Sequence, residues 1–225
     1  MNKQLLIFGT GEIGELAYFY FSHDTSWKIF GFVCDDEYFQ EEKFLGLPCI
    51  KFSEISKYPL KDYAVHVALS YRKLNRIREE KYNIFKSLGY EMPSYISSKS
   101  TIWSKDIGDN CFILEDQTIQ PNVKIGNNVM LWSGNHIGHG SIIENHVYLA
   151  SHVVISGHCR IGERTFIGVN AAMKDFITIG NDCFIGMGVN LTRDCTDGTV
   201  CLPSKDNLLS GDNVLAKKII KAYFG

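Results

Sequence analysis

An aliphatic residue recurs at every sixth position through the second half of the chain, and this repeat constrains the fold more than any other feature. It runs unbroken from Ile107 to Leu191, over fifteen positions that are all Ile, Leu or Met. A mostly small residue follows four places after each, forming a second column. Two inward columns with a period of six are typical of a parallel β-helix, left-handed in proteins of this pattern. Three hexads make one coil of about 18 residues, so residues 18 apart stack at about 4.8 Å.

The second column also accounts for three of the seven cysteines. Cys111, Cys159 and Cys183 fall in it, so we expect buried packing rather than catalysis. The cysteines are odd in number, scattered and without a C-x-x-C pair, which argues against a disulfide framework or a zinc knuckle and fits a reducing cytoplasm. The chain has a net charge of −2, so it has no excess of positive charge that would attract nucleic acid. Its apolar runs are too short for a signal peptide or a membrane span. We therefore expect a cytoplasmic protein without nucleic-acid or membrane partners.

The first part of the chain alternates short apolar strands with helical stretches, which predicts a small parallel sheet covered by helices. The glycines of Gly9-Thr-Gly11-Glu-Ile-Gly14 follow a strand and open a helix, the context in which this fingerprint binds a pyrophosphate. Asp35 and Asp36 end the next strand, where a dinucleotide fold places its ribose-binding acid. Taken alone, the fingerprint leaves NAD open, although the segment is too short for a whole dinucleotide site.

These patterns predict three segments. Residues 1–96 are expected to form a Rossmann-like α/β nucleotide-binding domain, and residues 97–200 a left-handed parallel β-helix. Residues 201–225 are expected to form a tail with a helix. In that helix Leu215, Ile219 and Tyr223 share one face.

The histidine-rich loop 136–140 is the best candidate for chemistry. Ile137 points inward in the hexad frame, so His139, two residues later, projects outward. Eighteen residues further along lies Gly157, whose backbone N–H is approachable beside the imidazole. A general base next to an oxyanion donor is the pair that acyl transfer requires. His136 is the lesser candidate, and we expect it to contact the substrate.

Five of the seven histidines lie in the coil, which raises the alternative of a zinc site between subunits. The chain has no H-x-x-x-x-H pair of the kind that supplies two zinc ligands in γ-carbonic-anhydrase-like proteins. His146, His152 and His158 occupy one hexad position on three different faces, so they cannot converge within one chain. We expect no metal.

The combination of a short nucleotide-binding domain and a hexapeptide coil resembles the bacterial nucleotide-sugar acyltransferases of the PglD/NeuD type. The resemblance covers essentially the whole chain, and its marks are residues 9–14, 35–36, 67–73, 94–100 and 134–140. It implies an N-acetyltransferase that moves acetyl from acetyl-CoA to a UDP-, dTDP- or GDP-linked amino sugar, for bacterial surface glycans such as the O-antigen of lipopolysaccharide. It also implies a homotrimer, with the acetyl donor between neighbouring subunits and nucleotide sugar rather than NAD in the first domain.

The resemblance assigns residues by position. It gives His139 the role of general base and Gly157 that of the amide near the thioester oxygen. The positions that it assigns to the nucleotide-sugar site are Gly9, Gly11, Asp35, Asp36 and Ser70. The positions that it assigns to acyl-CoA contacts are Tyr148, Val169 and Met187.

Two departures from the family pattern keep other functions open. Gly140 stands where the family often has an acid after the base, and Ile13 stands where the glycine loop often has a histidine. The alternatives are O-acetylation of a sugar or sialic acid hydroxyl, a metal-dependent hexapeptide-repeat enzyme, and a non-catalytic nucleotide-sugar-binding trimer. An amine is the better fit than a hydroxyl, because the weaker nucleophile depends more on a well-tuned base.

Overall fold

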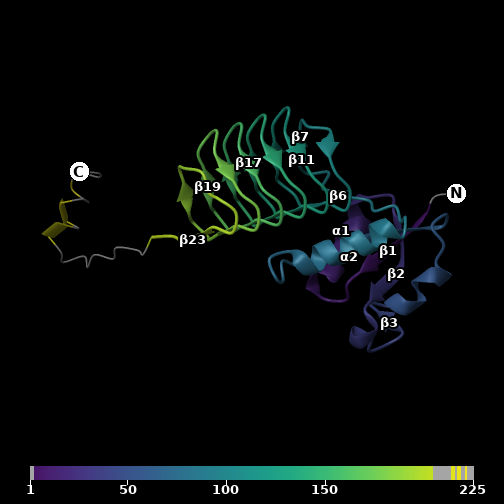
Figure 1. Cartoon of the computed structure of the whole chain (residues 1–225). Coiled ribbons are helices and arrows are strands. Elements are labelled where there is room, and N and C mark those ends of the chain that lie inside the picture. Colours follow the sequence, from purple (N-terminus) through teal and green to yellow (C-terminus); the bar gives the residue numbers. More distant parts are fainter. Residues whose placement is uncertain (1–2, 205–213, 216, 219–220, 222–225) are drawn as a thin grey trace.

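The structure, a computed structural model, describes residues 3–204 together with 214–215, 217–218 and 221. Residues 95–201 form a coil of two-residue strands, and residues 3–94, here called the N-terminal unit, pack against one side of it (Figure 1). Of the predicted C-terminal helix face, Ile219 and Tyr223 lie outside the described residues. Among the residues described, no helix is long and apolar enough to cross a membrane.

The N-terminal unit is built on a five-stranded sheet in the order β3-β4-β2-β1-β5. Its strands are β1 (Gln4–Phe8), β2 (Lys28–Cys34), β3 (Lys43–Phe44), β4 (Leu47–Lys51) and β5 (Tyr63–Val67). All neighbouring pairs are parallel except β3 and β4. Alternate side chains of β1 face opposite sides of the sheet, as strand geometry requires. One side packs with α1 (Glu12–Asp24) and the other with α2 (Arg76–Ser87).

The expectation of a Rossmann-like domain over residues 1–96 is wrong. Only α1 forms a helical crossover between parallel strands of this sheet. The chain between Cys34 and Tyr63, which is described throughout, forms the hairpin β3–β4 and two 3₁₀ helices, η1 (Asp36–Tyr38) and η2 (Phe52–Lys57), but no α-helix. A doubly wound domain needs a covering helix at each crossover. Short turns replace those helices here, so the chain is mainly a left-handed β-helix with few helices.

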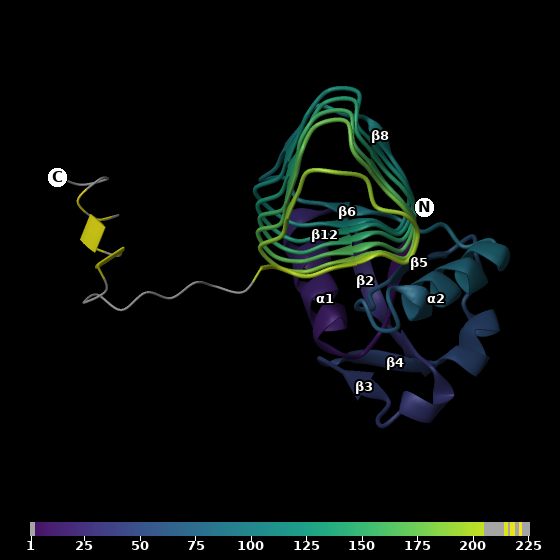
Figure 2. The ribbon, with the colours of Figure 1, turned by 60° about the vertical axis from the view of Figure 1, so that its left-hand side comes forward.

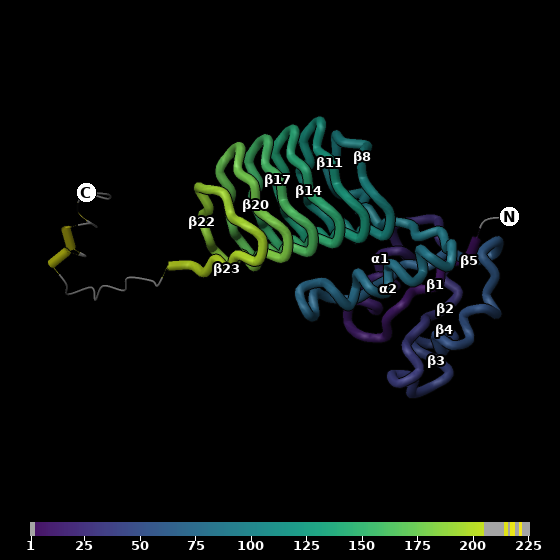
Figure 3. Tube along the Cα trace, in the orientation of Figure 1, coloured from purple at the N-terminus to yellow at the C-terminus, as the bar shows by residue number. Residues whose placement is uncertain are grey.

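The coil has three faces, each a parallel sheet whose strands recur once per turn (Figures 2 and 3). Face 1 contains β6 (Tyr95–Ile96), β9 (Phe112–Ile113), β12 (Met130–Leu131), β15 (Tyr148–Leu149), β18 (Phe166–Ile167), β21 (Phe184–Ile185) and β23 (Val200–Cys201). Face 2 contains β7 (Thr101–Ile102), β10 (Thr118–Ile119), β13 (His136–Ile137), β16 (Val154–Ile155), β19 (Ala172–Met173) and β22 (Asn190–Leu191). Face 3 contains β8 (Asp106–Ile107), β11 (Lys124–Ile125), β14 (Ile142–Ile143), β17 (Arg160–Ile161) and β20 (Thr178–Ile179).

The interior of the coil is the core that the repeat predicted. Ile137 and Ile155 pair in register on adjacent strands, 18 residues apart, and both are fully buried. Cys111, Cys159 and Cys183 also lie in this core, which confirms their predicted packing role. The structure begins the coil earlier than the repeat does, because β6 and β7 pair with β9 and β10 although they fall outside the hexad pattern.

Face 1 carries the N-terminal unit. Tyr95, Phe112 and Met130 of this face share one apolar cluster with Phe21 of α1. Arg78 of α2 is 1% exposed and reaches the coil, where its guanidinium donates to the carbonyl of Asn128 at 2.6 Å and to that of His146 at 3.1 Å. Burial lowers the pKa of Arg78 to about 10, which still leaves it charged at neutral pH.

Replacing Arg78 with leucine should destabilise the protein by roughly 2–3 kcal/mol, because it leaves two buried carbonyls without donors. The matched control is Arg76→Ala in the same helix, which removes an exposed ion pair with Asp182 at 2.8 Å and should cost less than about 1 kcal/mol. Urea unfolding followed by circular dichroism measures both. Equal midpoints for the two variants would show that Arg78 does not hold the unit to the coil.

Candidate active site

His139 lies at the corner of the coil that joins β13 of face 2 to β14 of face 3. Its side chain is exposed and its imidazole sits directly over Gly157 of the next turn. A methyl group built on Gly157 would come within 2.9 Å of the ring Cε1 and 3.2 Å of Nε2. Glycine is therefore needed at position 157 for the ring to occupy this place. The predicted juxtaposition of imidazole and glycine is present.

The backbone N–H of Gly157, the candidate oxyanion donor, already has an acceptor. It donates to a carboxylate oxygen of Asp175, one turn further along, at 2.8 Å. Asp175 is exposed, so its side chain can turn into solvent without opening the core. An acyl oxygen and this carboxylate would compete for the same N–H.

The missing acid after His139 has a structural reason. Gly140 adopts a φ of +66°, the left-handed conformation that favours glycine. A Cβ at this position would meet the Nδ1 of His158 at 2.6 Å. His158 also contacts the ring of His139 edge to face at 4.8 Å and stacks on Phe176 at 5.0 Å. His158 thus takes the space that a side chain at position 140 would need.

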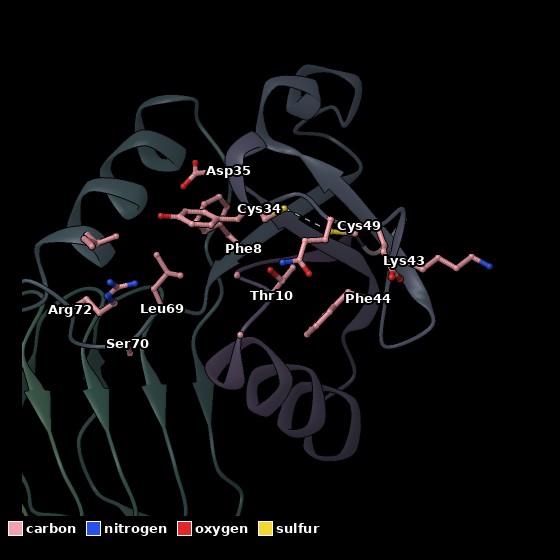
Figure 4. Close-up of a pocket in the computed structure, with 16 residues that line it drawn as sticks. Phe8, Thr10, Cys34, Asp35, Lys43, Phe44, Cys49, Leu69, Ser70 and Arg72 are labelled. Atoms are coloured by element: carbon pink, nitrogen blue, oxygen red, sulfur yellow. Dashed lines mark hydrogen bonds between the residues drawn. The ribbon is translucent and has the colours of Figure 1, made fainter.

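A first pocket of about 600 Å³ opens at the carboxyl ends of β1, β2 and β5 in the N-terminal unit. The predicted residues Gly9, Gly11, Asp35 and Ser70 line it. Figure 4 shows the labelled residues after β5 on one side of the pocket and Thr10 and the cysteine pair on the other, with the Lys43 side chain extending outward. The sulfurs of the cysteine pair, Cys34 and Cys49, lie 3.9 Å apart. This crevice is where open parallel sheets bind their ligands.

The two predicted acids of this pocket differ in their surroundings. The carboxylate of Asp35 forms an ion pair of 2.6 Å with Lys81 of α2 at the pocket wall. Asp36 is not among the lining residues, and its carboxylate accepts from the backbone and hydroxyl of Ser53 at 3.0 and 2.6 Å. These hydrogen bonds lower the pKa of Asp36. Of the two acids, Asp35 alone lines the pocket.

A second pocket of about 640 Å³ lies between the N-terminal unit and face 1. Gly11 and Ser70 line it from the unit, and two of the predicted acyl-CoA residues, Tyr148 and Val169, line it from the coil. Burial raises the pKa of Tyr148 to about 12, and its ring stacks on Phe166 at 5.1 Å. Met187 is 67% exposed and lines neither pocket.

The structure does not bring the predicted base to these pockets. The pockets lie in the N-terminal unit and against face 1, whereas His139 lies at the corner opposite that face. Figure 2 shows this arrangement, with the unit against one side of the triangle and the far corner pointing away from it. His136 is on face 2, between Thr118 and Val154 of the neighbouring strands. Within one chain, His139 and the two pockets are therefore separate.

The coil histidines do not gather as metal ligands. Among the described residues, no group of three or more His, Cys, Asp or Glu side chains could hold a metal ion. His146 is buried and its Nδ1 lies 2.8 Å from the amide nitrogen of Asn128. Burial lowers the pKa of His146 to about 4, so the ring is neutral and acts as a packing group.

Sequence reasoning missed three contacts that shape these sites. They are Gln120 against His139, Asp175 against Gly157, and Lys81 against Asp35. The 18-residue register could have indicated Asp175, because it stacks on Gly157. Lys81 lies 46 positions from Asp35, in a helix whose placement depends on the tertiary fold.

Part of the coil matches a known family of repeats. Residues 122–157 and 158–193 each match the family described as bacterial transferase hexapeptide (six repeats). The acyl-[acyl-carrier-protein]–UDP-N-acetylglucosamine O-acyltransferase of Stutzerimonas stutzeri is 29% identical over 117 residues, which are 49% of this chain and 45% of that protein. The match thus spans less than half the length of that curated relative.

Solved structures match nearly the whole chain. The acetyltransferase domain of PglB from Neisseria gonorrhoeae, in complex with acetyl coenzyme A, has a TM-score of 0.76 and 21% identity, over 89% of this chain and 96% of that one. A histidine-to-asparagine mutant of perosamine N-acetyltransferase from Caulobacter crescentus, in complex with CoA and GDP-perosamine, has a TM-score of 0.78 and 19% identity, over 89% and 93%. At such identities the likeness shows a shared fold. Residues 122–193 thus match a bacterial transferase hexapeptide repeat, and the predicted resemblance to left-handed β-helix sugar acetyltransferases is confirmed.

Proposed function

We propose that the protein is a cytoplasmic homotrimeric acyltransferase that moves acetyl from acetyl-CoA to the amine of a nucleotide-linked sugar. In this proposal residues 1–96 bind the nucleotide sugar and residues 97–200 carry the transfer. The observation that carries it is the imidazole of His139 held over the backbone of Gly157 on a hexapeptide coil. The solved acetyltransferases of this fold, whose complexes contain acetyl-CoA, CoA or GDP-perosamine, support the substrate classes.

The chemistry follows from these two groups. The sugar amine attacks the thioester carbonyl, so that a C–N bond forms and the C–S bond breaks. Nε2 of His139 accepts the proton from the amine, which can then pass to the departing CoA thiolate. The N–H of Gly157 donates to the carbonyl oxygen as it gains negative charge, once Asp175 has released it. A general base of this kind contributes roughly 10²–10⁴-fold to rate.

The first pocket suits a nucleotide diphosphate. The loop Gly9–Gly11 precedes α1, and the N-terminus of a helix favours negative charge. Arg72 lines the same pocket and supplies a cation from the segment after β5. These groups compensate for Ile13, which offers no donor where the family often has a histidine.

The separation of His139 from the pockets supports an assembly of several copies, and we propose a trimer. The coil is triangular and cannot bend the corner that carries His139 onto face 1 of the same chain. His139 can therefore meet a pocket only in a neighbouring copy. Apolar side chains are exposed at this corner and on face 2, where Trp103 is 69%, Phe176 75% and Val154 42% exposed. Closed cyclic contacts between identical copies would cover them.

A second candidate is transfer to a hydroxyl. It is favoured by the curated relatives that match the coil, which are O-acyltransferases by name. Treating the labelled product with hydroxylamine separates the two cases, because an ester is cleaved and an amide survives.

Subunit complementation tests the shared site. His139→Ala should lower turnover by roughly 10²–10⁴-fold. Gly11→Trp should block the pockets, because a Cβ at Gly11 meets no atom within 4 Å and the side chain fills open space. The two variants are co-expressed with different tags, and mixed trimers are purified through both. Each mixed trimer contains one intact site in three, so activity should return to about a third of the parental value.

The separate variants are the controls, and light scattering reports their assembly. Mixed assemblies without activity would place the whole site within one chain. A monomer at micromolar concentration would remove the shared site altogether.

Removing the carboxylate of Asp175 should strengthen acyl-donor binding. Asp175→Ala frees the N–H of Gly157, so the KM for acetyl-CoA should fall about three- to tenfold, equivalent to about 0.7–1.4 kcal/mol. The matched control is Asp197→Ala, because Asp197 accepts the backbone N–H of Asn181 at 2.8 Å in the same way at another corner. Steady-state kinetics with varied acetyl-CoA measures both. An unchanged KM in the Asp175 variant would mean that this N–H does not meet the thioester.

A further inference from the structure

Side chains at the corners of the coil bridge adjacent turns in a regular way. At corners where face 3 meets face 1, the backbone N–H of one residue donates to the side chain of the residue 18 positions later. Asn127 accepts from Asp109 at 3.0 Å, and Asn181 accepts from Glu163 at 2.8 Å. Each of these N–H groups thus has a side-chain acceptor on the following turn.

The corner that carries His139 departs from this rule. The residue 18 positions after His139 is Gly157, which has no side chain to accept the backbone N–H of His139. Gln120, on the preceding turn, replaces it: its Oε1 lies 2.8 Å from the backbone nitrogen of His139. The same oxygen lies 3.1 Å from Nδ1 of the imidazole. One amide oxygen therefore meets both the backbone and the ring of the candidate base.

This double contact determines which ring nitrogen of His139 carries the proton. A backbone N–H can only donate, so the atom of Gln120 that faces it is the oxygen. An amide oxygen can only accept, so the hydrogen bond to the ring requires a proton on Nδ1 of His139. A neutral imidazole carries one proton, and its Nε2, beside Gly157, is then left with a lone pair.

We propose that Gln120 is a positioning residue that holds His139 in the Nδ1–H tautomer, so that Nε2 can accept the proton of the attacking amine. The inference rests on the proposed function of His139. Gln120 does the work that an acidic side chain after the base would do, from a place that does not collide with His158. It is half-buried on the turn below, and the coil register sets its distance from the ring.

The two test variants are Gln120→Leu, which keeps bulk but removes the acceptor, and Gln120→Glu, which keeps an acceptor. The leucine variant should lose roughly tenfold in kcat with little change in KM for acetyl-CoA. The glutamate variant should keep turnover within about threefold of the parent. Its carboxylate stabilises the protonated imidazole, so the acid limb of its pH–rate profile should move up by roughly 0.5–1 pH unit.

A spectroscopic readout makes the inference independent of turnover. In protein labelled with ¹⁵N-histidine, the His139 ring nitrogens, assigned by their loss in His139→Ala, should report Nδ1–H in the parent. In Gln120→Leu they should shift towards Nε2–H, the form that a neutral histidine favours in water. If His139→Ala retained full turnover the proposed function would fail, while these spectra would still show whether Gln120 sets the tautomer.

The control is Asn181→Leu, which removes an equivalent side-chain acceptor at another corner and should change neither the His139 spectrum nor kcat. An Nε2–H signal in the parent would overturn the proposal. A leucine variant with parental spectrum and kcat would overturn it too, as would equal loss of kcat in Gln120→Leu and Gln120→Glu without a shift of the pH profile.

Discussion

The stacking of the inward aliphatic column fixes where nearly every other residue of the coil lies. Because Ile137 sits directly over its counterpart one turn away, the corner residues of successive turns are also held in register. The imidazole of His139 is over Gly157 for this reason, and not because of any direct attraction between the two. Packing in the apolar core thus sets which backbone positions of the exposed corner lie together, and side-chain contacts such as that of Gln120 then orient the His139 ring.

The same register limits what each corner residue can be. At the corner that carries His139, the residue two positions before each face 3 strand has a left-handed backbone in successive turns. Its φ is +66° at Gly140, +57° at His158 and +63° at Phe176. The ring of His158 stacks on Phe176 of the next turn and leans over Gly140 of the turn before, where a Cβ would meet it. At this corner Gly140 leaves room for His158, and Gln120 of the preceding turn supplies the contact to the His139 ring.

The repeat made the coil predictable, including its buried cysteines and the pairing of His139 with Gly157, because a period of six maps each residue onto a face without tertiary information. The N-terminal unit was predicted less well. The glycine loop and the first strands were located from the sequence. The sequence pattern of the segment after Cys34 fits crossover helices and a hairpin equally well, and the structure has the hairpin. The contact of Asp36 with Ser53 was not predictable, because it depends on how two 3₁₀ helices of the N-terminal unit lie relative to each other. The contact of Gln120 with His139 was not predictable either, because it depends on how far a side chain reaches between turns of the coil.

Rigidity is what separates the two halves of the candidate site. Three continuous sheets and a dry core hold the triangular section fixed, and Arg78 together with the cluster around Phe112 fixes the N-terminal unit on face 1. A hinge between unit and coil could not carry the first pocket round to the opposite corner without breaking these contacts. A site that joins the pocket to His139 therefore has to form between copies, and the precision of that junction depends on how the exposed corner and face 2 of one copy pack against the next. In the proposed assembly the coil would supply the base and the neighbouring unit would bind the substrate, so that neither would be competent alone.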